Sequence, residues 1–263
     1  PKFFVTTNQI EGNTIIIQND DVKHIKNVLR AKINDTIDIC NCDTYKNYIC
    51  KIQQIEEKKI YCNIIEEITS NVESNVQVSI FQGLPKSDKM ELVIQKSVEL
   101  GAYDTTAVEM KRCVVKLNEK DKVKKIQRWQ KIAESAAKQS GRDIIPNVNP
   151  IINVKNICEK MKEYDLVLVA YENEKKNTLK QELKKIKDEN KGIKIAIVIG
   201  PEGGIDIEEI NKFRENNAKI ITLGNRILRT ETVALNVLSI IMCELESEDR
   251  VKNNYNFGLS QIV

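Results

Sequence analysis

The stretch KIAIVIGPEGGIDIEEI (residues 194–210) joins an apolar run, a glycine-rich loop and the beginning of a helix. The run from 194 to 200 is almost continuously apolar, as in strands that are buried on both faces of a parallel sheet. After the loop, Asp206 is placed to cap a helix, and Glu209 follows three residues later as its capping-box partner. An apolar strand that leads through a short loop into a helix is the repeating unit of an α/β domain. This stretch therefore predicts the fold class.

The same alternation of strands and helices extends over most of the chain after residue 76. Near-continuous apolar strands separated by helices imply a parallel sheet that is covered on both faces. Strands are predicted at 78–84, 105–109, 165–171, 194–200 and 219–223, and helices near 87–100, 119–139, 176–189, 206–216 and 231–246.

The first seventy residues follow a different pattern, in which short strands are separated by turn residues. A polar segment at 69–75 is typical of a linker, so we predict one domain at 1–72 and a second at 73–263. A helical interruption at 20–30 carries Val22, Ile25, Val28 and Leu29 at helical spacing. The strands are predicted at 3–6, 13–18, 35–41, 47–55 and 59–68, a spacing typical of a small barrel or sandwich.

The composition is that of an ordinary globular protein, with 41% apolar residues, 30% charged residues and a net charge of +3. No apolar run is long enough to span a bilayer, and the first residues lack the pattern of an export signal, so we expect a cytoplasmic protein. Its seven cysteines are scattered, which favours reduced thiols. Cys40 and Cys42 would suit a zinc site, but the strand pattern and the single histidine favour thiols packed inside a strand. We predict no metal.

Three loops follow predicted strands and are richer in glycine or polar residues than a connection requires: 170–174, 200–206 and 224–232. In open parallel sheets, ligands bind beyond the carboxyl ends of the strands. The loop at 200–206 lacks the lysine of a phosphate loop and the GxGxxG spacing of a dinucleotide site. The three loops therefore predict a ligand site of another kind.

Arg226 and Arg229 stand immediately before a predicted helix, where positive charge opposes the helix dipole. Thr230 is a suitable N-cap and Glu231 suits the first turn, so helix stability explains these two residues. It does not explain the arginines, and we infer that they bind an anionic or polarised substrate group.

A basic helix at 122–142 presents either an ordinary solvated face or a surface that contacts successive RNA phosphates. Its apolar stripe is predicted to comprise Val123, Ile126, Ala133 and Ala137, and Trp129 and His24 are expected to be packed. The lysines and arginine expected to point outward are Lys122, Lys124, Lys125, Lys131, Lys138 and Arg142, near Lys86, Lys89 and the segment 111–116.

Taken together, these loops closely resemble one family, the bacterial small-subunit ribosomal RNA uridine-N3 methyltransferases of the SPOUT superfamily. The resemblance rests on IGPEGGIDIEE (199–209) and LGNRILRTET (223–232). Further matches at 24–30, 86–102 and 129–146 run in the family order and extend the resemblance over nearly the whole chain.

The resemblance implies an N-terminal PUA-like β-barrel that helps to hold RNA and a C-terminal α/β domain with a trefoil knot. It also implies a homodimer that acts on small-subunit ribosomal RNA in an assembled or assembling particle. S-adenosylmethionine would lie among the three loops, held by Leu168, Ala170, Gly200, Glu202, Gly203, Leu223, Gly224, Ile227 and Leu228.

The same resemblance implies roles for charged residues. Arg229 and Arg226 would orient RNA or stabilise charge on the uracil oxygens, and Glu231 or Glu202 would accept a proton or anchor the cofactor. RNA contacts are expected from Lys2, Arg30, Lys86, Arg112 and Arg142.

Three positions depart from the family pattern: Lys2 replaces arginine, Cys113 replaces serine, and Val233 replaces a small residue. Two alternatives stay open from the sequence. The first is another SPOUT enzyme that methylates a ribose hydroxyl or a different base, and the second is an RNA-binding assembly factor without catalysis. An enzyme that uses NAD or phosphate is disfavoured by the missing fingerprints.

Overall fold

The computed structural model describes residues 1–86, 88–186 and 192–246. Ser87 and residues 187–189, within two predicted helices, and the end of the predicted second domain, 247–263, lie outside this range. The chain forms two compact units. One unit contains residues 1–73 together with 137–145, and the other contains 74–136 together with the chain from 146 onward.

The first unit is built on a six-stranded sheet in the order β1-β4-β5-β6-β3-β2. The strand β1 pairs with β4 in parallel, and the other pairs are antiparallel. All five strands predicted for this part of the chain are confirmed, and the short β2 was not predicted. The strands are β1 (Lys2–Val5), β2 (Ile10–Glu11), β3 (Thr14–Gln18), β4 (Thr36–Asn41), β5 (Asn47–Ile55) and β6 (Lys59–Ile68).

Alternate residues of these strands form one buried cluster that includes Phe3, Ile39 and Ile52. The prediction that the thiols of the 36–42 stretch pack inward is confirmed at Cys40 but not at Cys42, which lies beyond the end of β4 and is only partly buried. Cys50 and Cys62 of the neighbouring strands are buried like Cys40. Burial raises the pKa of each of these three thiols to about 12, so they stay protonated at neutral pH.

The helical segment at 20–30 departs from the predicted regular helix. It begins as α1 (Asp20–Lys23) and continues as the π-helical turn His24–Val28. The wider turn holds one residue more than an α-helical turn, so later side chains rotate away from the buried face. Val22 and Ile25 are buried as the spacing suggests, whereas Val28 is 68% exposed. His24 packs edge-on against Phe3, as expected for a packed histidine.

Residues 137–145 join the first unit through charged groups that are largely buried. Arg142 makes a two-pronged ion pair with Glu73, at 2.8 Å from Nε to Oε1 and 2.6 Å from Nη2 to Oε2. The backbone amides of Asp143 and Ile144 donate to the same carboxylate. Asp143 in turn pairs with Lys2. Glu73 is therefore the centre of a network that holds this segment.

We expect Glu73→Ala to lower the free energy of unfolding by about 2 kcal/mol, because Arg142 and two amides lose their acceptor. This is less than the cost of breaking a fully buried pair, since the Glu73 side chain is 26% exposed. Urea denaturation followed by circular dichroism measures the change. Glu67→Ala is the matched control, because Glu67 forms an ion pair with Lys46 on the surface of the same unit. Equal effects of the two substitutions would contradict this assignment.

The second unit contains a six-stranded, fully parallel sheet in the order β12-β10-β11-β7-β8-β9. All five strands predicted for this unit are present, which confirms the α/β class. The strands are β7 (Gln77–Gly83), β8 (Asp104–Glu109), β9 (Asn147–Asn153), β10 (Leu166–Ala170), β11 (Lys194–Ile199) and β12 (Lys219–Ile221). The helices are α2 (Lys89–Glu99), α3 (Glu119–Ser140), α4 (Val154–Lys160), α5 (Leu179–Ile186), α6 (Ile207–Glu215) and α7 (Thr230–Leu245). The end of α3, from residue 137, belongs to the first unit.

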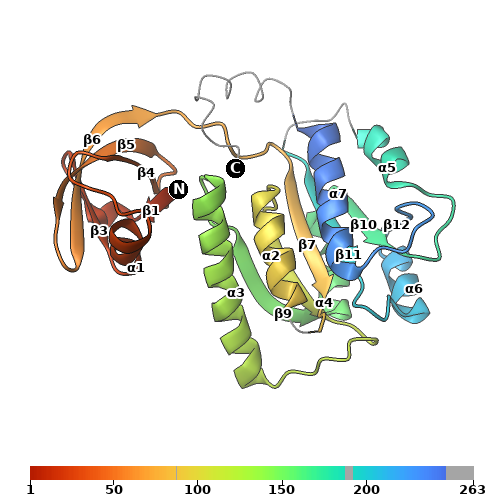
Figure 1. Ribbon diagram of the computed structural model, residues 1–263. Helices are drawn as coiled ribbons and strands as arrows, with labels where there is room; N and C mark the ends of the chain where they lie inside the picture. The colour runs from red at the N-terminus through yellow and green to blue at the C-terminus, as the bar shows by residue number, and fades with distance from the viewer. Residues whose placement is uncertain (87, 187–191, 247–263) are drawn as a thin grey trace. The chain divides into compact units, whose positions relative to one another are not determined.

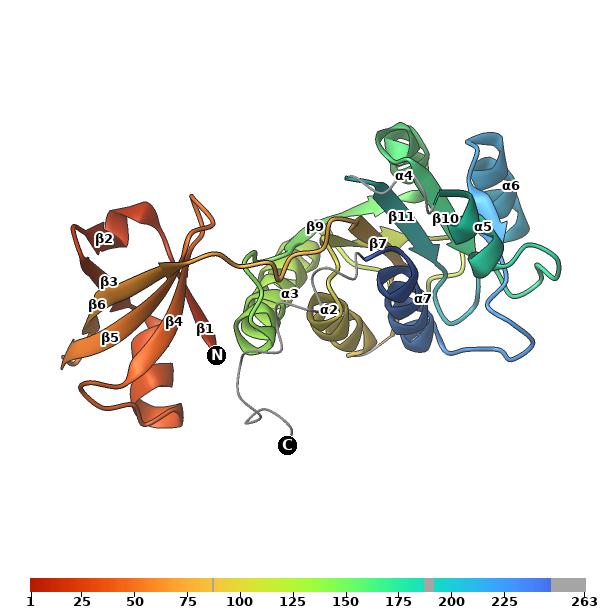
Figure 2. The same cartoon turned by 90° about the horizontal axis from the view of Figure 1, so that it is seen from above.

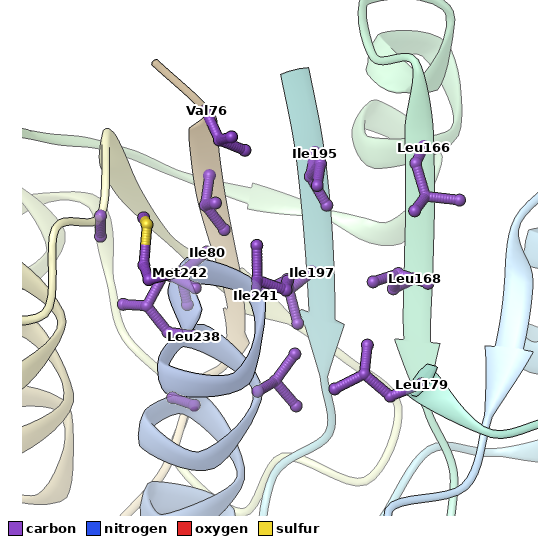
Figure 3. Close-up of a cluster of buried hydrophobic side chains, with 14 of the residues drawn as sticks. Val76, Ile80, Leu166, Leu168, Leu179, Ile195, Ile197, Leu238, Ile241 and Met242 are labelled. Atoms are coloured by element: carbon purple, nitrogen blue, oxygen red, sulfur yellow. The ribbon is translucent and has the colours of Figure 1, made fainter. Parts of the chain in front are cut away.

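Helices cover both faces of this sheet, with α2 and α7 on one face and α4 and α6 on the other (Figures 1 and 2). The main core lies between the sheet and α7. Figure 3 shows Ile80, Ile195 and Ile197 of the strands beside Leu238 and Ile241 of α7, and these residues are at most 2% exposed in the second unit's core. None of the helices in the described ranges is both long and apolar enough to cross a membrane.

Three elements of this unit were not predicted: β9, α4 and the 3-10 turn Met161–Glu163 that follows α4. The strand β9 contains Pro150 and several asparagines, which weaken its strand signal. It forms the edge of the sheet, where a proline is tolerated because one side needs no partner. The helix α4 has seven residues and is too short for a clear periodic pattern.

Candidate functional site

The loops that follow β10, β11 and β12 surround a pocket of about 500 Å³. The three strands are parallel, and β10 lies between the other two, so their carboxyl ends meet at one edge of the sheet. The predicted convergence of the three loops is confirmed. The volume is within the range of small-molecule sites in proteins.

Most of the residues expected to hold a cofactor line this pocket. Leu168 differs, because it is 0% exposed and packs in the core below the loops (Figure 3). Glu231 lies in the first turn of α7, where its side chain is 16% exposed. The expected residues found in the lining are Ala170, Gly200, Glu202, Gly203, Leu223, Gly224, Ile227 and Leu228, with Arg226 and Arg229.

Other lining residues had no assigned place in the site. Lys89 comes from α2 and was interpreted only as part of a basic surface. Tyr171 and Glu172 belong to a loop that the sequence did single out, so its position after a strand was the available signal. The remaining ones are Lys175, Ile199, Pro201, Gly204, Ile205, Thr222, Asn225, Thr230 and Val233.

Close backbone packing shapes the floor of the pocket. A Cβ atom on Gly83 would lie 2.6 Å from the Pro201 nitrogen, so the end of β7 and the 200–206 loop touch here. Gly204 has a φ of +71°, and a Cβ there would lie 2.5 Å from Oε1 of Glu172. Both positions therefore require glycine.

Thr230 ties three chain segments together at the pocket. Its hydroxyl donates to the Gly200 carbonyl at 2.7 Å and accepts from Nε2 of Gln82 at 2.7 Å. The expectation that Thr230 is the N-cap of α7 is wrong, because Arg229 occupies that position. The threonine side chain turns inward to Gly200 and Gln82 instead of bonding the free amides of its own helix.

Arg226 and Arg229 are exposed and line the pocket. Arg229 makes no side-chain capping bond to α7. Ile227, between the two arginines, is 89% exposed. No hydrogen bond or ion pair engages the side chains of Arg226 and Arg229 within the described part of the chain, so both are available to a ligand.

Two carboxylates share one ammonium group beside the pocket. Nζ of Lys89 lies 3.2 Å from Oε1 of Glu202 and 3.4 Å from Oε2 of Glu231. Partial burial by itself would raise the pKa of Glu202, but backbone amides and the Lys89 ammonium outweigh burial and hold this pKa below its usual value. Hydrogen bonding to Glu202 raises the pKa of Lys89 in turn. Glu202 and Lys89 are therefore both ionised at neutral pH.

The glycine-rich loop is fixed at its far end by a helix cap. The predicted capping box is confirmed, with Asp206 accepting from the Glu208 amide and Glu209 accepting from the Asp206 amide. Arg112 donates to the Gly203 carbonyl at 3.2 Å and lies 3.4 Å from Asp206. Arg112 thus contacts the loop that lines the pocket.

The residues expected to contact RNA fall into two groups. Arg30, Lys86 and Arg112 are exposed, and Arg30 has a φ of +53°. Lys2 and Arg142 are not exposed, because they form ion pairs with Asp143 and Glu73 inside the first unit. The expected outward orientation of Arg142 is wrong, since its residue is only 4% exposed.

Some of the lysines of α3 that were expected to point freely into solvent form ion pairs instead. Lys122 pairs with Glu109 and Glu119, and Lys138 pairs with Asp21. The apolar stripe is correct at Ala133 and Ala137, which are buried, but Val123 is 55% exposed. Val123 lies in the second turn of the helix, before the part that packs. Trp129 is 2% exposed, as predicted for a core residue.

The fold and the pocket define an α/β protein with a small-molecule site at the carboxyl edge of its parallel sheet. A family model described as an RNA methyltransferase domain matches residues 72–242, and an RNA methyltransferase PUA domain matches residues 17–65. The chain belongs to this RNA methyltransferase family.

Individual relatives agree with this assignment. The chain is 37% identical over 249 residues to the ribosomal RNA small subunit methyltransferase E of Bacillus subtilis (strain 168), covering 93% of this chain and 97% of the relative. It is also similar to the crystal structure of a protein of the same name from Neisseria gonorrhoeae bound to S-adenosyl methionine. That comparison gives a TM-score of 0.80 and 31% identity and covers 92% of this chain and 97% of the other.

A second similar structure is a putative methyltransferase from Legionella pneumophila in complex with S-adenosyl methionine. Its TM-score is 0.80 at 27% identity, with 92% of this chain and 96% of the other covered. The similarity to all three proteins extends over both units of the chain.

Proposed function

We propose that this protein transfers the methyl group of S-adenosylmethionine to N3 of a uridine in small-subunit ribosomal RNA. The observation that carries the proposal is the three-loop pocket with two exposed arginines at its lining. The two relatives with a bound S-adenosyl methionine share this fold at 27% and 31% identity. A ribosomal RNA substrate would place the reaction in the cytoplasm, on an assembled or assembling particle.

The pocket fits the cofactor in size. Its volume of about 500 Å³ accommodates a nucleoside with an amino-acid tail. Leu168 is buried, and we propose that it supports the Ala170 end of β10 from behind. The residues proposed to hold the cofactor are Ala170, Gly200, Glu202, Gly203, Leu223, Gly224, Ile227 and Leu228.

When bound, the cofactor supplies an activated methyl group on a sulfonium, whose bonding electron pair stays with sulfur as the new N3–carbon bond forms. The protein has to position uracil and to remove the N3 proton. Arg226 and Arg229 would stabilise the negative charge that develops on the uracil oxygens. Glu202 or Glu231 would take the proton and pass it to water.

We also propose that the chain from β12 through α7 forms the trefoil knot typical of the SPOUT superfamily. The bonds from Thr230 to Gly200 and Gln82, with the close approach of Gly83 to Pro201, support a tight crossing of three segments. A homodimer with an RNA site from both subunits belongs to the same proposal. Arg30, Lys86 and Arg112 are exposed and suited to RNA contact, whereas Lys2 and Arg142 stabilise the first unit.

The proposal predicts that the purified protein transfers a labelled methyl group to small-subunit RNA or particles and that nucleoside digestion yields N3-methyluridine. A methylated ribose or another methylated base would overturn the uridine-N3 assignment and leave a different methyltransferase. Isothermal titration calorimetry without RNA is the second measurement. If it detected no cofactor binding, the protein would be an RNA-binding factor without this catalysis.

A further inference from the structure

The charge cluster beside the pocket draws its members from three separate parts of the chain. Lys89 begins α2, Glu202 lies in the loop after β11, and Glu231 lies in the first turn of α7. One ammonium nitrogen joins both carboxylates, at 3.2 Å and 3.4 Å. Glu202 lines the pocket together with Lys89, whereas Glu231 lies outside the lining.

Two carboxylates that share one site repel each other, and one of them then gains a proton at higher pH than usual. A cation between the two carboxylates cancels this repulsion, and the Lys89 ammonium lies between Glu202 and Glu231. The Lys86 backbone amide also donates a hydrogen bond to Oε1 of Glu202 at 3.0 Å. The low pKa of Glu202, which persists despite partial burial, agrees with this arrangement.

We infer that Lys89 is a positioning residue that keeps Glu202 ionised and oriented at the pocket as the acceptor of the uridine N3 proton. Glu231 anchors the other side of the Lys89 ammonium and so fixes its place. The inference rests on the proposed function and deepens it by naming the proton acceptor and the residue that prepares it.

Among the described residues, Lys89 is the cation that contacts both Glu202 and Glu231. Arg112, another cation at the glycine-rich loop, contacts the Gly203 carbonyl and Asp206. On α2 itself, Glu91 forms an ion pair with Arg128 of α3, and Asp88 is exposed. The remaining charged groups of the pocket are Glu172, Lys175, Arg226 and Arg229.

The test compares pH–rate profiles of single-turnover methyl transfer for the wild type, Lys89→Gln and Lys89→Arg. Without the cation, Glu202 becomes protonated at higher pH, so the acidic limb of the Lys89→Gln profile moves to higher pH. The ratio of wild-type to Lys89→Gln rates is expected to grow roughly twofold between about pH 8 and about pH 4.5, where a carboxyl group of ordinary pKa is half protonated. Lys89→Arg keeps a cation and should restore most of the wild-type profile. A defect of Lys89→Gln that is the same at every pH would overturn the inference.

Lys111→Gln is the matched control, because Lys111 also bridges two carboxylates, Asp206 at 3.4 Å and Glu208 at 3.2 Å. Lys111 lies outside the pocket lining, so this variant should leave the pH dependence of the rate unchanged.

A second measurement separates this inference from the proposed function. Carboxyl resonances of ¹³C-labelled glutamate are titrated in the full chain without cofactor. In Lys89→Gln a glutamate should titrate at higher pH than in the wild type, whereas Lys111→Gln should leave the Glu202 titration in place. An unchanged titration in Lys89→Gln would overturn the role of Lys89, even if the wild type methylates uridine N3. Methylation at another atom would overturn the proposed function and leave the charge-setting role intact.

Discussion

Arg229→Ala is expected to lower the rate constant of methyl transfer roughly 100- to 1000-fold, the usual loss when a donor to a developing oxyanion is removed. The guanidinium is exposed, lines the pocket and makes no capping bond to α7. Removing it therefore takes nothing from the core, and it also removes a cation that opposes the helix dipole. Single-turnover methyl transfer measures the loss, and thermal unfolding should show a melting temperature close to that of the wild type.

Two further variants test whether the loss of rate comes from the Arg229 guanidinium itself. Arg229→Lys keeps the charge but not the planar, two-pronged donor, so it should recover only part of the rate. Arg214→Ala removes an exposed arginine from α6, outside the pocket lining, and should leave the rate unchanged. Wild-type activity in Arg229→Ala would contradict the role proposed for Arg229 in stabilising uracil.

Elements with a strong local pattern were predictable from the sequence, and elements that depend on their neighbours were not. The apolar run 194–200 needed no tertiary information to be recognised as β11. The strand β9 is polar and contains Pro150, and it becomes a strand because β8 offers it an edge. The π-helical turn at His24–Val28 likewise has no signal in the hydrophobic spacing, and Val28 is exposed although its spacing predicts burial.

The candidate site shows the same division. The loops after β10, β11 and β12 could be placed together because parallel strands end at one edge. Lys89 could not be assigned to the pocket, because its contact with Glu202 and Glu231 joins residues more than a hundred positions apart. The prediction that Arg142 contacts RNA was wrong for a related reason. A basic residue in a basic segment suggests RNA binding, but the ion-pair partner of Arg142, Glu73, lies 69 positions earlier in the chain.

Thr230→Val is expected to lower the free energy of unfolding by about 1–2 kcal/mol, because the Gly200 carbonyl and the Gln82 amide lose their bonds to the hydroxyl. The loss is limited because Nε2 of Gln82 still donates to the Gly83 carbonyl at 3.0 Å and to the Gly200 carbonyl at 3.4 Å. Valine keeps the shape of the side chain, so the effect reports the hydroxyl rather than a cavity. The residues involved are enclosed, with Gln82 at 0% and Thr230 at 7% exposed. Urea denaturation of the full chain measures the loss of stability.

The same substitution should weaken cofactor binding roughly tenfold in calorimetry, since Gly200 lines the pocket and loses the bond that fixes its carbonyl. Thr232→Val is the matched control, because Thr232 lies on the exposed side of the same helix and should change neither quantity. Thr230→Ser retains the hydroxyl and should keep most of the affinity. If Thr230→Val lost stability but bound the cofactor as the wild type does, the threonine would hold α7 in place without shaping the pocket. A parallel loss of both quantities, restored by serine, would mean that the start of α7 and the glycine-rich loop form a single binding structure.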